Sequence, residues 1–292
     1  MEYHQPVLLE ESLKFLQIRP EGRYIDATLG DGGHSVAMLK LGGTVLGLDV
    51  NQKSLDRAAE RITEAGLSHT FIRVKGNFKH LESLAKQAGF VRVDGVLFDL
   101  GVSSTQLADQ QMGLSFSSDA ELNMRLDDQL GVKALDLING LYESELADLF
   151  WKYGQERLAK QFAKEIVRAR ELEKLSSARQ LAELARKAFP GYEKGRLHPA
   201  TRIFMALRIA VNDELENLKS ALPQAGRLLL PGGRMVVISF HSLEDKMVKE
   251  FAQGAQPCEL REVVKGPVMP TPEEIAQNPR ARSAKMRVLE KL

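Results

Sequence analysis

The sequence predicts an α/β fold in which a doubly wound parallel sheet is interrupted by an inserted helical domain. In the first hundred residues, β-rich runs alternate with helical periodicity, a pattern typical of a parallel sheet with helices on both faces. Between residues 105 and 234 no convincing strand is evident, and helical spacing dominates. A strand pattern then resumes. The length of 292 residues leaves room for this arrangement, and 43% hydrophobic residues exclude disorder as the working state.

Four short apolar runs in the first half are expected to be strands, at residues 24–27, 45–50, 70–74 and 95–100. Between the first two lie a glycine-rich turn, Gly30-Asp31-Gly32-Gly33, and a helix expected over residues 35–41. Asn51 is placed to cap the helix after the second strand, where apolar residues repeat at helical spacing. This half therefore supplies four strands and their crossover helices.

In the second half, helical spacing from residue 143 to 189 is broken at Gly154, at Ser176-Ser177 and at Phe189-Pro190-Gly191. One long helix is expected over residues 200–222, a fifth strand over 235–240 and a helix over 243–251. Two further β-like runs follow, at residues 259–265 and 283–289. We therefore expect a core of residues 1–105 and 206–292, with a helical insertion of residues 106–205.

Charge and cysteine usage limit the partners. Lys+Arg 40 against Asp+Glu 39 gives a net charge of +1, so a polyanion would have to be held by a local patch. The single Cys258 excludes an internal disulfide and a multi-cysteine zinc site, and no metal is expected. No signal peptide or membrane-length apolar run is evident, which predicts a cytoplasmic protein without a membrane partner. The oligomeric state is left open.

A cofactor site is predicted at the carboxyl ends of the first two strands. Asp26 ends the first strand, and Gly30, Gly32 and Gly33 follow it. Asp49 ends the second strand about 20 residues further on, where a carboxylate can accept both ribose hydroxyls of an adenosine. Glycines in such a turn let the backbone approach a ligand closely.

Two cofactor classes fit this pattern. A dinucleotide requires a third glycine or alanine near the helix start, where this chain has Ser35, and Asp26 would repel its phosphates. S-adenosylmethionine carries an ammonium group and a cationic sulfonium, which such a carboxylate would attract. The pattern favours S-adenosylmethionine, with a dinucleotide as the alternative.

Each candidate also has a purely structural interpretation. Glycine clusters occur in ordinary turns, and an Asp before a helix is often a cap, although Asn51 is the better-placed cap here. His34 either orients the turn or contacts the ligand through its backbone N–H. Phe78 either packs on adenine or belongs to the core. Asp99, at the end of the fourth strand, either positions the methionine end or an acceptor amine, or is structural.

Six blocks of sequence resemble the RsmH (MraW) family, and they run from residue 4 to residue 283. They are His4-Gln-Pro-Val-Leu-Leu9, Asp26-Ala-Thr-Leu-Gly-Asp-Gly-Gly-His-Ser35, Asp99-Leu-Gly-Val-Ser-Ser-Thr-Gln106, His198-Pro-Ala-Thr-Arg202, Ile238-Ser-Phe-His-Ser-Leu-Glu-Asp245 and Asn278-Pro-Arg-Ala-Arg-Ser283. The resemblance implies an S-adenosylmethionine-dependent N4-cytosine methyltransferase acting on a decoding-site cytidine of small-subunit (16S) ribosomal RNA. It also implies a class I methyltransferase core with an inserted helical domain.

Carried over position by position, the resemblance implies seven cofactor contacts: Gly32, Gly33, His34, Asp49, Phe78, Asp99 and Gln106. The chain departs from the family pattern at four positions: Asn51, Met112, Asn123 and Met205. None of the four is a predicted cofactor contact, but Met112 and Asn123 leave the details of the acceptor side open.

Methyl transfer is an in-line displacement, so the enzyme must place the acceptor nitrogen behind the methyl group. A cytosine amine is a poor nucleophile, and an acceptor oxygen must hold it and let its proton leave. Asp99 is the first candidate for this catalytic role. Further acceptor-side candidates are His198, Arg202, Asn212 and His241.

Other conspicuous residues are expected to be structural. Ser242 and Asp245 have the spacing of a helix capping box, and Trp151 is expected in the core of a helical face. Basic residues form two groups expected to contact RNA phosphates: Arg186, Lys187, Lys194, Arg196, Arg202 and Arg208, and then Arg280, Arg282, Lys285 and Arg287. The alternatives are a methyltransferase for a small molecule or protein, and a ribosome-assembly binding protein without turnover.

Overall fold

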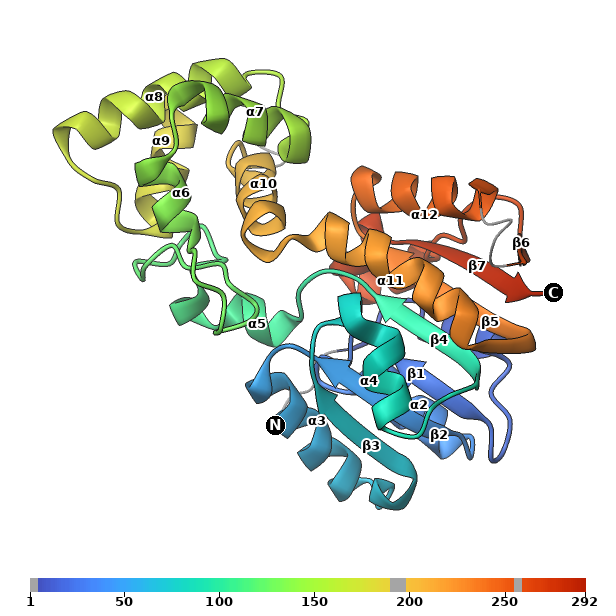
Figure 1. Ribbon diagram of the computed structural model, residues 1–292. Coiled ribbons are helices and arrows are strands. Elements are labelled where there is room, and N and C mark those ends of the chain that lie inside the picture. Colours follow the sequence, from blue (N-terminus) through green and yellow to red (C-terminus); the bar gives the residue numbers. More distant parts are fainter. Residues whose placement is uncertain (1–4, 190–197, 255–258) are drawn as a thin grey trace. The chain divides into compact units, whose positions relative to one another are not determined.

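The structure is a computed structural model that describes residues 5–189, 198–254 and 259–292 (Figure 1). The chain forms two compact units, one of residues Met1–Ser103 with Leu215–Leu292 and one of residues Ser104–Glu214. We call them the sheet unit and the helical unit. The predicted insertion, residues 106–205, falls within the helical unit. Four residues of the sequence-based predictions lie outside the described residues, together with the turn at Pro190-Gly191: His4, Lys194, Arg196 and Cys258.

The sheet unit contains a seven-stranded sheet with the order β3-β2-β1-β4-β5-β7-β6. The strands are β1 (Arg23–Asp26), β2 (Thr44–Asp49), β3 (Phe71–Lys75), β4 (Val93–Asp99), β5 (Leu229–Ser239), β6 (Leu260–Glu262) and β7 (Lys285–Lys291). Strands β1 to β5 run parallel to one another, while β7 runs antiparallel to both β5 and β6. The predicted α/β fold is confirmed, with an antiparallel edge formed by the two C-terminal runs.

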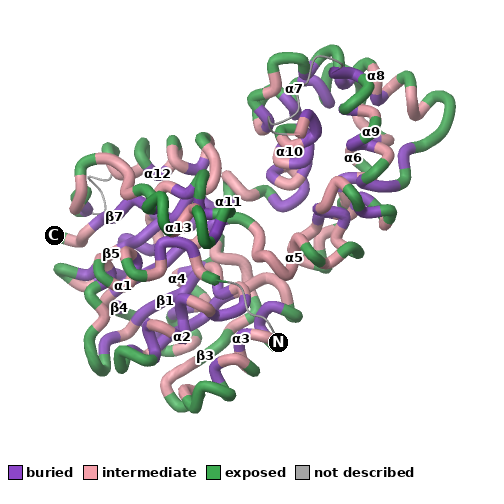
Figure 2. Tube along the Cα trace, turned by 180° about the vertical axis from the view of Figure 1, so that it is seen from behind, coloured by how far each residue is buried: buried purple, intermediate pink, exposed green. Residues whose placement is uncertain are grey.

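Helices cover both faces of this sheet. Core residues of α4 (Leu81–Gln87), α11 (Glu214–Leu228) and α12 (Ser242–Gly254) pack on one face, which Figure 1 shows in front. The opposite face, seen in Figure 2, carries α1 (Leu9–Leu16), α2 (Gly33–Lys40), α3 (Gln52–Glu64) and α13 (Pro272–Gln277). Phe98 and Val237 point into the first layer, whereas Leu97 and Val236 point into the second. Burial on both faces explains why the central strands are continuous apolar runs.

The helical unit consists of α5 (Ser104–Ala108), α6 (Ala134–Gly140), α7 (Glu143–Gly154), α8 (Ala159–Leu172), α9 (Ala178–Ala188) and α10 (Thr201–Asn212). Short 3-10 helices occur in both units: η1 (Ser68–Thr70), η2 (Phe78–His80), η3 (Gln110–Met112) and η5 (Pro279–Ser283). The ring centroids of Phe150 and Phe189 each lie 5.6 Å from that of Phe162, at the centre of the helix packing. The predicted breaks at Gly154 and Ser177 are confirmed, because α7 ends at Gly154 and Ser177 caps α9.

Three predicted elements need correction. The helix expected over residues 200–222 is two helices, because Asp213 adopts a left-handed conformation with φ 52 between α10 and α11. Strand β5 begins at Leu229, well before the expected residue 235, since it continues through a Pro-Gly-Gly sequence. Trp151 is not in the core but 62% exposed, because the buried face of α7 includes its neighbour Phe150 instead.

Within the described part of the chain, every helix is too short or too polar to cross a membrane.

Candidate functional site

Three carboxylates lie at the carboxyl ends of adjacent parallel strands. Asp26 ends β1, Asp49 ends β2 and Asp99 ends β4. Strand β1 lies between β2 and β4, and the helices α2, which follows β1, and α11, which precedes β5, pack on opposite faces of the sheet. In open α/β sheets this switch point is where ligands bind, outside the carboxyl ends of the strands. The predicted positions of all three residues at strand ends are confirmed.

The glycine turn after β1 is fastened to the end of β2. The backbone N–H of Gly30 donates to Asp49 Oδ2 at 2.9 Å, and that of Asn51 donates to Oδ1 at 2.8 Å. Gly32 has φ +73, and a Cβ there would lie 3.0 Å from the Cβ of Ala58. A Cβ on Gly33 would collide with the side chain of Pro6. Backbone conformation and close packing therefore require glycine at both predicted contact positions.

Asp26 and Asp49 both favour the protonated form more than an exposed carboxyl does. Burial raises the pKa of Asp26 to about 6, although the Ser35 hydroxyl donates to its Oδ2 at 2.7 Å. Burial likewise raises the pKa of Asp49 to about 6, against the opposing effect of its backbone donors. Among residues 5–189, 198–254 and 259–292, no cationic side chain pairs with either carboxyl to stabilise its charge.

Asp99 is in the least compensated environment of the three. Its Oδ1 is buried and makes no hydrogen bond to any residue that the structure describes. Burial raises the pKa of Asp99 well above its usual range, and the charges of Asp26 and Glu244 raise it further. A cluster of carboxyls with an orphaned acceptor fits a ligand that brings positive charge and N–H donors. The ammonium end of S-adenosylmethionine meets this requirement, whereas the phosphates of a dinucleotide do not.

His34 connects the start of α2 with two other segments. Its Nε2 lies 3.2 Å from the carbonyl oxygen of Val7, and its Nδ1 lies 3.7 Å from Asp99 Oδ2. Because a carbonyl oxygen only accepts, Nε2 carries a proton and the other ring nitrogen faces the carboxyl. The side chain of His34 therefore links the turn to Val7 and Asp99, and contact of its backbone N–H with a cofactor stays a prediction.

The two remaining predicted contacts differ in their surroundings. Phe78, at the start of η2, packs edge-on against Phe98 with ring centroids 5.9 Å apart, and its side chain is half-buried. The Phe78 ring therefore packs against the core and is also partly accessible to solvent. Gln106 lies in α5 of the helical unit. Contact of either residue with a cofactor stays a prediction.

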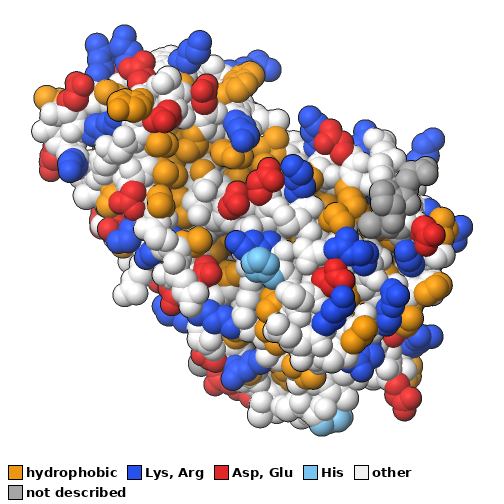
Figure 3. Space-filling view, in the orientation of Figure 1, with side chains coloured by type: hydrophobic (Ala, Val, Ile, Leu, Met, Phe, Trp, Pro, Cys, Tyr) orange, Lys and Arg blue, Asp and Glu red, His pale blue; other side chains and the backbone are white. Residues whose placement is uncertain are grey.

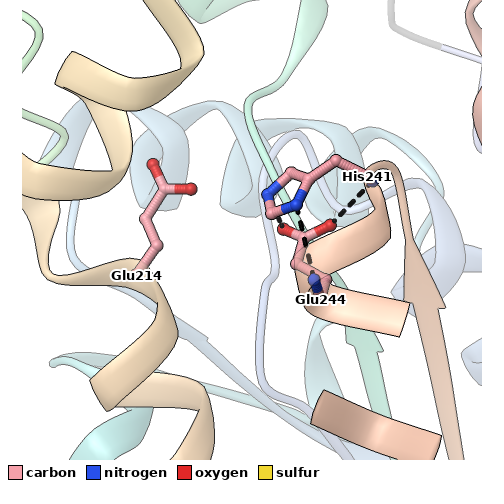
Figure 4. Close-up of side chains that lie close together, drawn as sticks. All are labelled: Glu214, His241 and Glu244. Carbon is pink, nitrogen blue, oxygen red and sulfur yellow. Dashed lines mark hydrogen bonds and ion pairs between the residues drawn. The ribbon is translucent and has the colours of Figure 1, made fainter. Parts of the chain in front are cut away.

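A buried histidine–glutamate pair follows β5 and was missed by the sequence analysis as a unit (Figure 4). The Nε2 of His241 lies 3.2 Å from Glu244 Oε1, with the two side chains 8% and 4% exposed. Glu244 Oε2 accepts from the backbone N–H groups of Phe240 and His241 at 2.8 and 3.2 Å. The spacing of three residues between His241 and Glu244 at the start of a helix was the sequence signal that could have predicted this pair.

This arrangement corrects the capping box predicted for Ser242 and Asp245. Glu244 closes the first turn of α12, while Asp245 Oδ1 accepts from Arg287 Nε at 2.7 Å. Although burial opposes it, the hydrogen bond and charge of Arg287 lower the pKa of Asp245. Asp245 is therefore structural, as predicted, but through an ion pair rather than a cap.

The acceptor-side candidates of the helical unit separate into packed and accessible residues. Asn212 is buried, with Nδ2 donating to Met124 O at 2.8 Å and Oδ1 accepting from Leu126 N at 2.7 Å, so it serves the fold. The ring of His198 stacks on Phe116 and is half-buried. Arg202 is exposed and lies 3.8 Å from Glu156. The predicted roles of His198 and Arg202 therefore remain open.

The family departures Met112 and Asn123 occupy one irregular loop. The carbonyl oxygen of Met112 accepts from Met124 N at 2.7 Å, and Asn123 Oδ1 accepts from Arg125 Nε at 2.7 Å. Both residues stabilise the loop through these bonds.

Only part of the predicted basic surface is accessible. Arg287 is buried and pairs with Asp245 and Glu262, and Arg208 pairs with Glu214 at 2.8 Å, so neither fits the predicted phosphate contact. Leaving aside Lys194 and Arg196, which lie outside the described residues, the exposed arginines and lysines of the two clusters are Arg186, Lys187, Arg202, Arg280 and Arg282. Figure 3 shows basic and acidic side chains interspersed over one face, consistent with a near-zero net charge.

Comparison with known proteins places these features in a family context. The MraW methylase family matches residues 1–292. The chain is 44% identical to ribosomal RNA small subunit methyltransferase H of Carboxydothermus hydrogenoformans, covering 100% of this chain and 99% of that protein. It is 45% identical to the protein of the same name from Thermomicrobium roseum, covering 99% and 94%. Among solved structures, a proposed rRNA-methylase from Clostridium thermocellum shares the fold, with TM-score 0.50, 14% identity and coverage of 99% and 100%.

Proposed function

The chain belongs to the MraW methylase family, and from this premise we propose that it methylates the N4 amine of a decoding-site cytidine in 16S ribosomal RNA, using S-adenosylmethionine. The observation that carries this proposal is the convergence of three carboxyls whose pKa values are raised by burial, Asp26, Asp49 and Asp99, at the switch point of the sheet. Such a site favours a cationic cofactor. The methyl acceptor is the cytosine amine. The partner is the small ribosomal subunit, in the cytoplasm.

The cofactor-binding residues divide by chemistry. Asp49 presents carboxylate oxygens for the ribose hydroxyls, while the backbone of Gly32 and Gly33 allows close approach. Phe78 offers an aromatic surface for adenine, and Asp99 with His34 lies where the methionine end is expected. Gln106 completes the contacts implied by the family. When bound, S-adenosylmethionine supplies an electrophilic methyl group on a positively charged sulfur.

Asp99 is the proposed catalytic residue. With S-adenosylmethionine bound as methyl donor, the cytosine amine that accepts the methyl group would have to be oriented and would have to lose a proton. A carboxylate that holds the amine N–H orients the nitrogen lone pair and accepts that proton. Burial raises the pKa of Asp99 well above its usual range, which makes it a stronger base near neutral pH than an ordinary aspartate.

The RNA is held by exposed basic side chains rather than by net charge. Arg186 and Lys187 lie at the end of α9, and Arg280 and Arg282 lie in η5. Contacts of this kind release counterions from phosphates, so binding weakens as salt rises. A variant with these four residues replaced by glutamine is expected to bind RNA more weakly with a shallower salt dependence.

Transfer of labelled methyl groups to three substrates tests the proposal. We expect incorporation into small subunits isolated from cells that lack this methylation, and little into free cytidine. Comparison with naked 16S RNA shows whether the assembled particle is required. Label on a small metabolite or protein would contradict the RNA substrate, and absence of incorporation by folded, cofactor-bound protein would favour an assembly factor without turnover.

A further inference from the structure

Three aromatic rings contact one another in series within the helical unit. The ring of Phe116 lies parallel to that of His198, with centroids 4.7 Å apart and an interplanar angle of 23°. Phe204, which is 5% exposed, contacts Phe116 edge-on with centroids also 4.7 Å apart. The stack thus begins in the core of the unit and continues outward to Phe116 and His198, which are both half-buried.

The outer ring is an uncharged aromatic surface beside a cation. His198 Nδ1 accepts from the backbone N–H of Ala200 at 3.1 Å, which leaves the proton of the neutral imidazole on Nε2. Burial and the nearby charge of Arg186 lower the pKa of His198, so the ring is neutral at physiological pH. Arg186 itself is exposed at the C-terminal turn of α9.

We propose that the Phe116–His198 ring pair is a stacking platform for an unpaired nucleobase of the RNA, with Arg186 contacting the adjacent phosphate. Every base offers a π face, and an aromatic ring with a neighbouring guanidinium is a recurring arrangement for single-stranded nucleic acid. This inference rests on the proposed function in one respect, namely that RNA is the ligand. It adds a subsite in the helical unit that recognises a base.

An unpaired base fits these observations better than duplex RNA or a protein partner does. A cytosine amine inside a duplex is not accessible to an enzyme, so the substrate must present unstacked nucleotides near the target. A base that is no longer stacked on neighbouring bases can stack on an aromatic side chain of the protein instead. Phe116 packs edge-on against the buried Phe204, so the ring pair is anchored to the core of the helical unit.

A pair of charge-matched ligands tests the platform directly. One is a uridine RNA of about 12 nucleotides, within the site sizes common for such proteins, and the other is a sugar-phosphate chain of equal length without bases. We expect the full-length protein to bind the RNA about tenfold more tightly than the abasic chain, the contribution typical of one stacked base. His198→Ala should abolish this preference, and His198→Phe should retain most of it.

Charge variants separate stacking from phosphate binding. Arg186→Gln should weaken binding of both ligands by the same factor, whereas Arg168→Gln, on the exposed surface of α8, should change neither. Melting temperature and affinity for S-adenosylhomocysteine, measured for each variant, show that the sheet unit is intact. Equal affinity of the unaltered protein for both ligands would overturn the inference, as would an undiminished preference in His198→Ala. Failure of methyl transfer to small subunits would instead contradict the proposed function.

Discussion

The sheet unit and the helical unit position their candidate residues in different ways. In the sheet unit, Asp26, Asp49 and Asp99 are placed by strand ends, so backbone topology brings them together. In the helical unit, Asn212 is buried and hydrogen-bonds to the loop at Met124, while His198 is half-buried and stacks on Phe116. The proposed cofactor contacts are therefore placed by the backbone of the sheet, whereas the proposed RNA contacts are accessible side chains.

The largest effect is expected from Asp99→Asn. Loss of the proposed proton acceptor should reduce methyl transfer by about 100-fold or more. The same substitution should raise the melting temperature of the cofactor-free protein, because it removes a buried carboxyl whose pKa is raised by burial and by Asp26 and Glu244. Single-turnover transfer rates and calorimetry measure the two effects. Near-normal transfer would contradict the catalytic role, and a lower melting temperature would contradict the electrostatic account.

Gly32→Ala should damage the fold and the cofactor site together. A left-handed alanine costs about 1–2 kcal/mol, and its Cβ would meet Ala58 at 3.0 Å. Gly66→Ala is a matched control, because Gly66 has φ +72 but no atom within 4 Å of an added Cβ. Both variants should lose stability to denaturant, but only Gly32→Ala should bind S-adenosylhomocysteine more weakly. Equal affinities in the two variants would remove the turn from the cofactor site.

The raised carboxyl pKa values predict a pH dependence that arises from the strand ends of the sheet unit. Asp26 and Asp49 titrate at about 6 in the folded protein and near 4 when unfolded, so the folded state binds more protons between these values. Their contribution to the free energy of unfolding should therefore fall as pH rises from about 4 to 6, and cofactor affinity should increase over the same range. Denaturant titrations at several pH values measure the difference in free energy of unfolding between the unaltered protein and Asp49→Asn. A difference that does not change with pH would contradict the prediction.

The smallest effect is expected from Trp151→Ala in the helical unit. Because this side chain is 62% exposed, truncation should change the free energy of unfolding by no more than about 0.5 kcal/mol. Trp151 is the single tryptophan of the chain, so its fluorescence reports its environment directly. Emission typical of a water-exposed indole, with ready quenching by acrylamide, is the expected result. Blue-shifted, unquenched emission would place the ring in the core after all.

The strand ends of the sheet unit could be predicted from sequence because local signals coincide there. At Asp26, Asp49 and Asp99 an apolar run stops at an acid, and the structure ends each strand at that residue. The break between α10 and α11 carries no such signal. Helical periodicity runs through Asp213, and the break accompanies bonds from Asn212 to Met124 and Leu126, which are distant in sequence.

Side-chain roles that depend on residues distant in sequence were also not predicted correctly. Local capping rules favoured Asp245, but an ion pair with Arg287 on β7 holds that carboxylate, and Glu244 takes the capping position. Arg287 was assigned to an RNA surface for the same reason, since its burial depends on a partner 42 residues away. Sequence therefore located the three strand-end carboxyls, while the pairing of charges between elements required the structure.

Mapping of the methylated nucleoside in 16S ribosomal RNA tests the central claim most directly. Small subunits lacking the modification would be incubated with the protein and S-adenosylmethionine, and the RNA digested for mass spectrometry. The account predicts N4-methylcytidine in a single decoding-site fragment, and its loss with Asp99→Asn. A methyl group on another atom or base, or an unmodified digest from active, cofactor-bound protein, would contradict it.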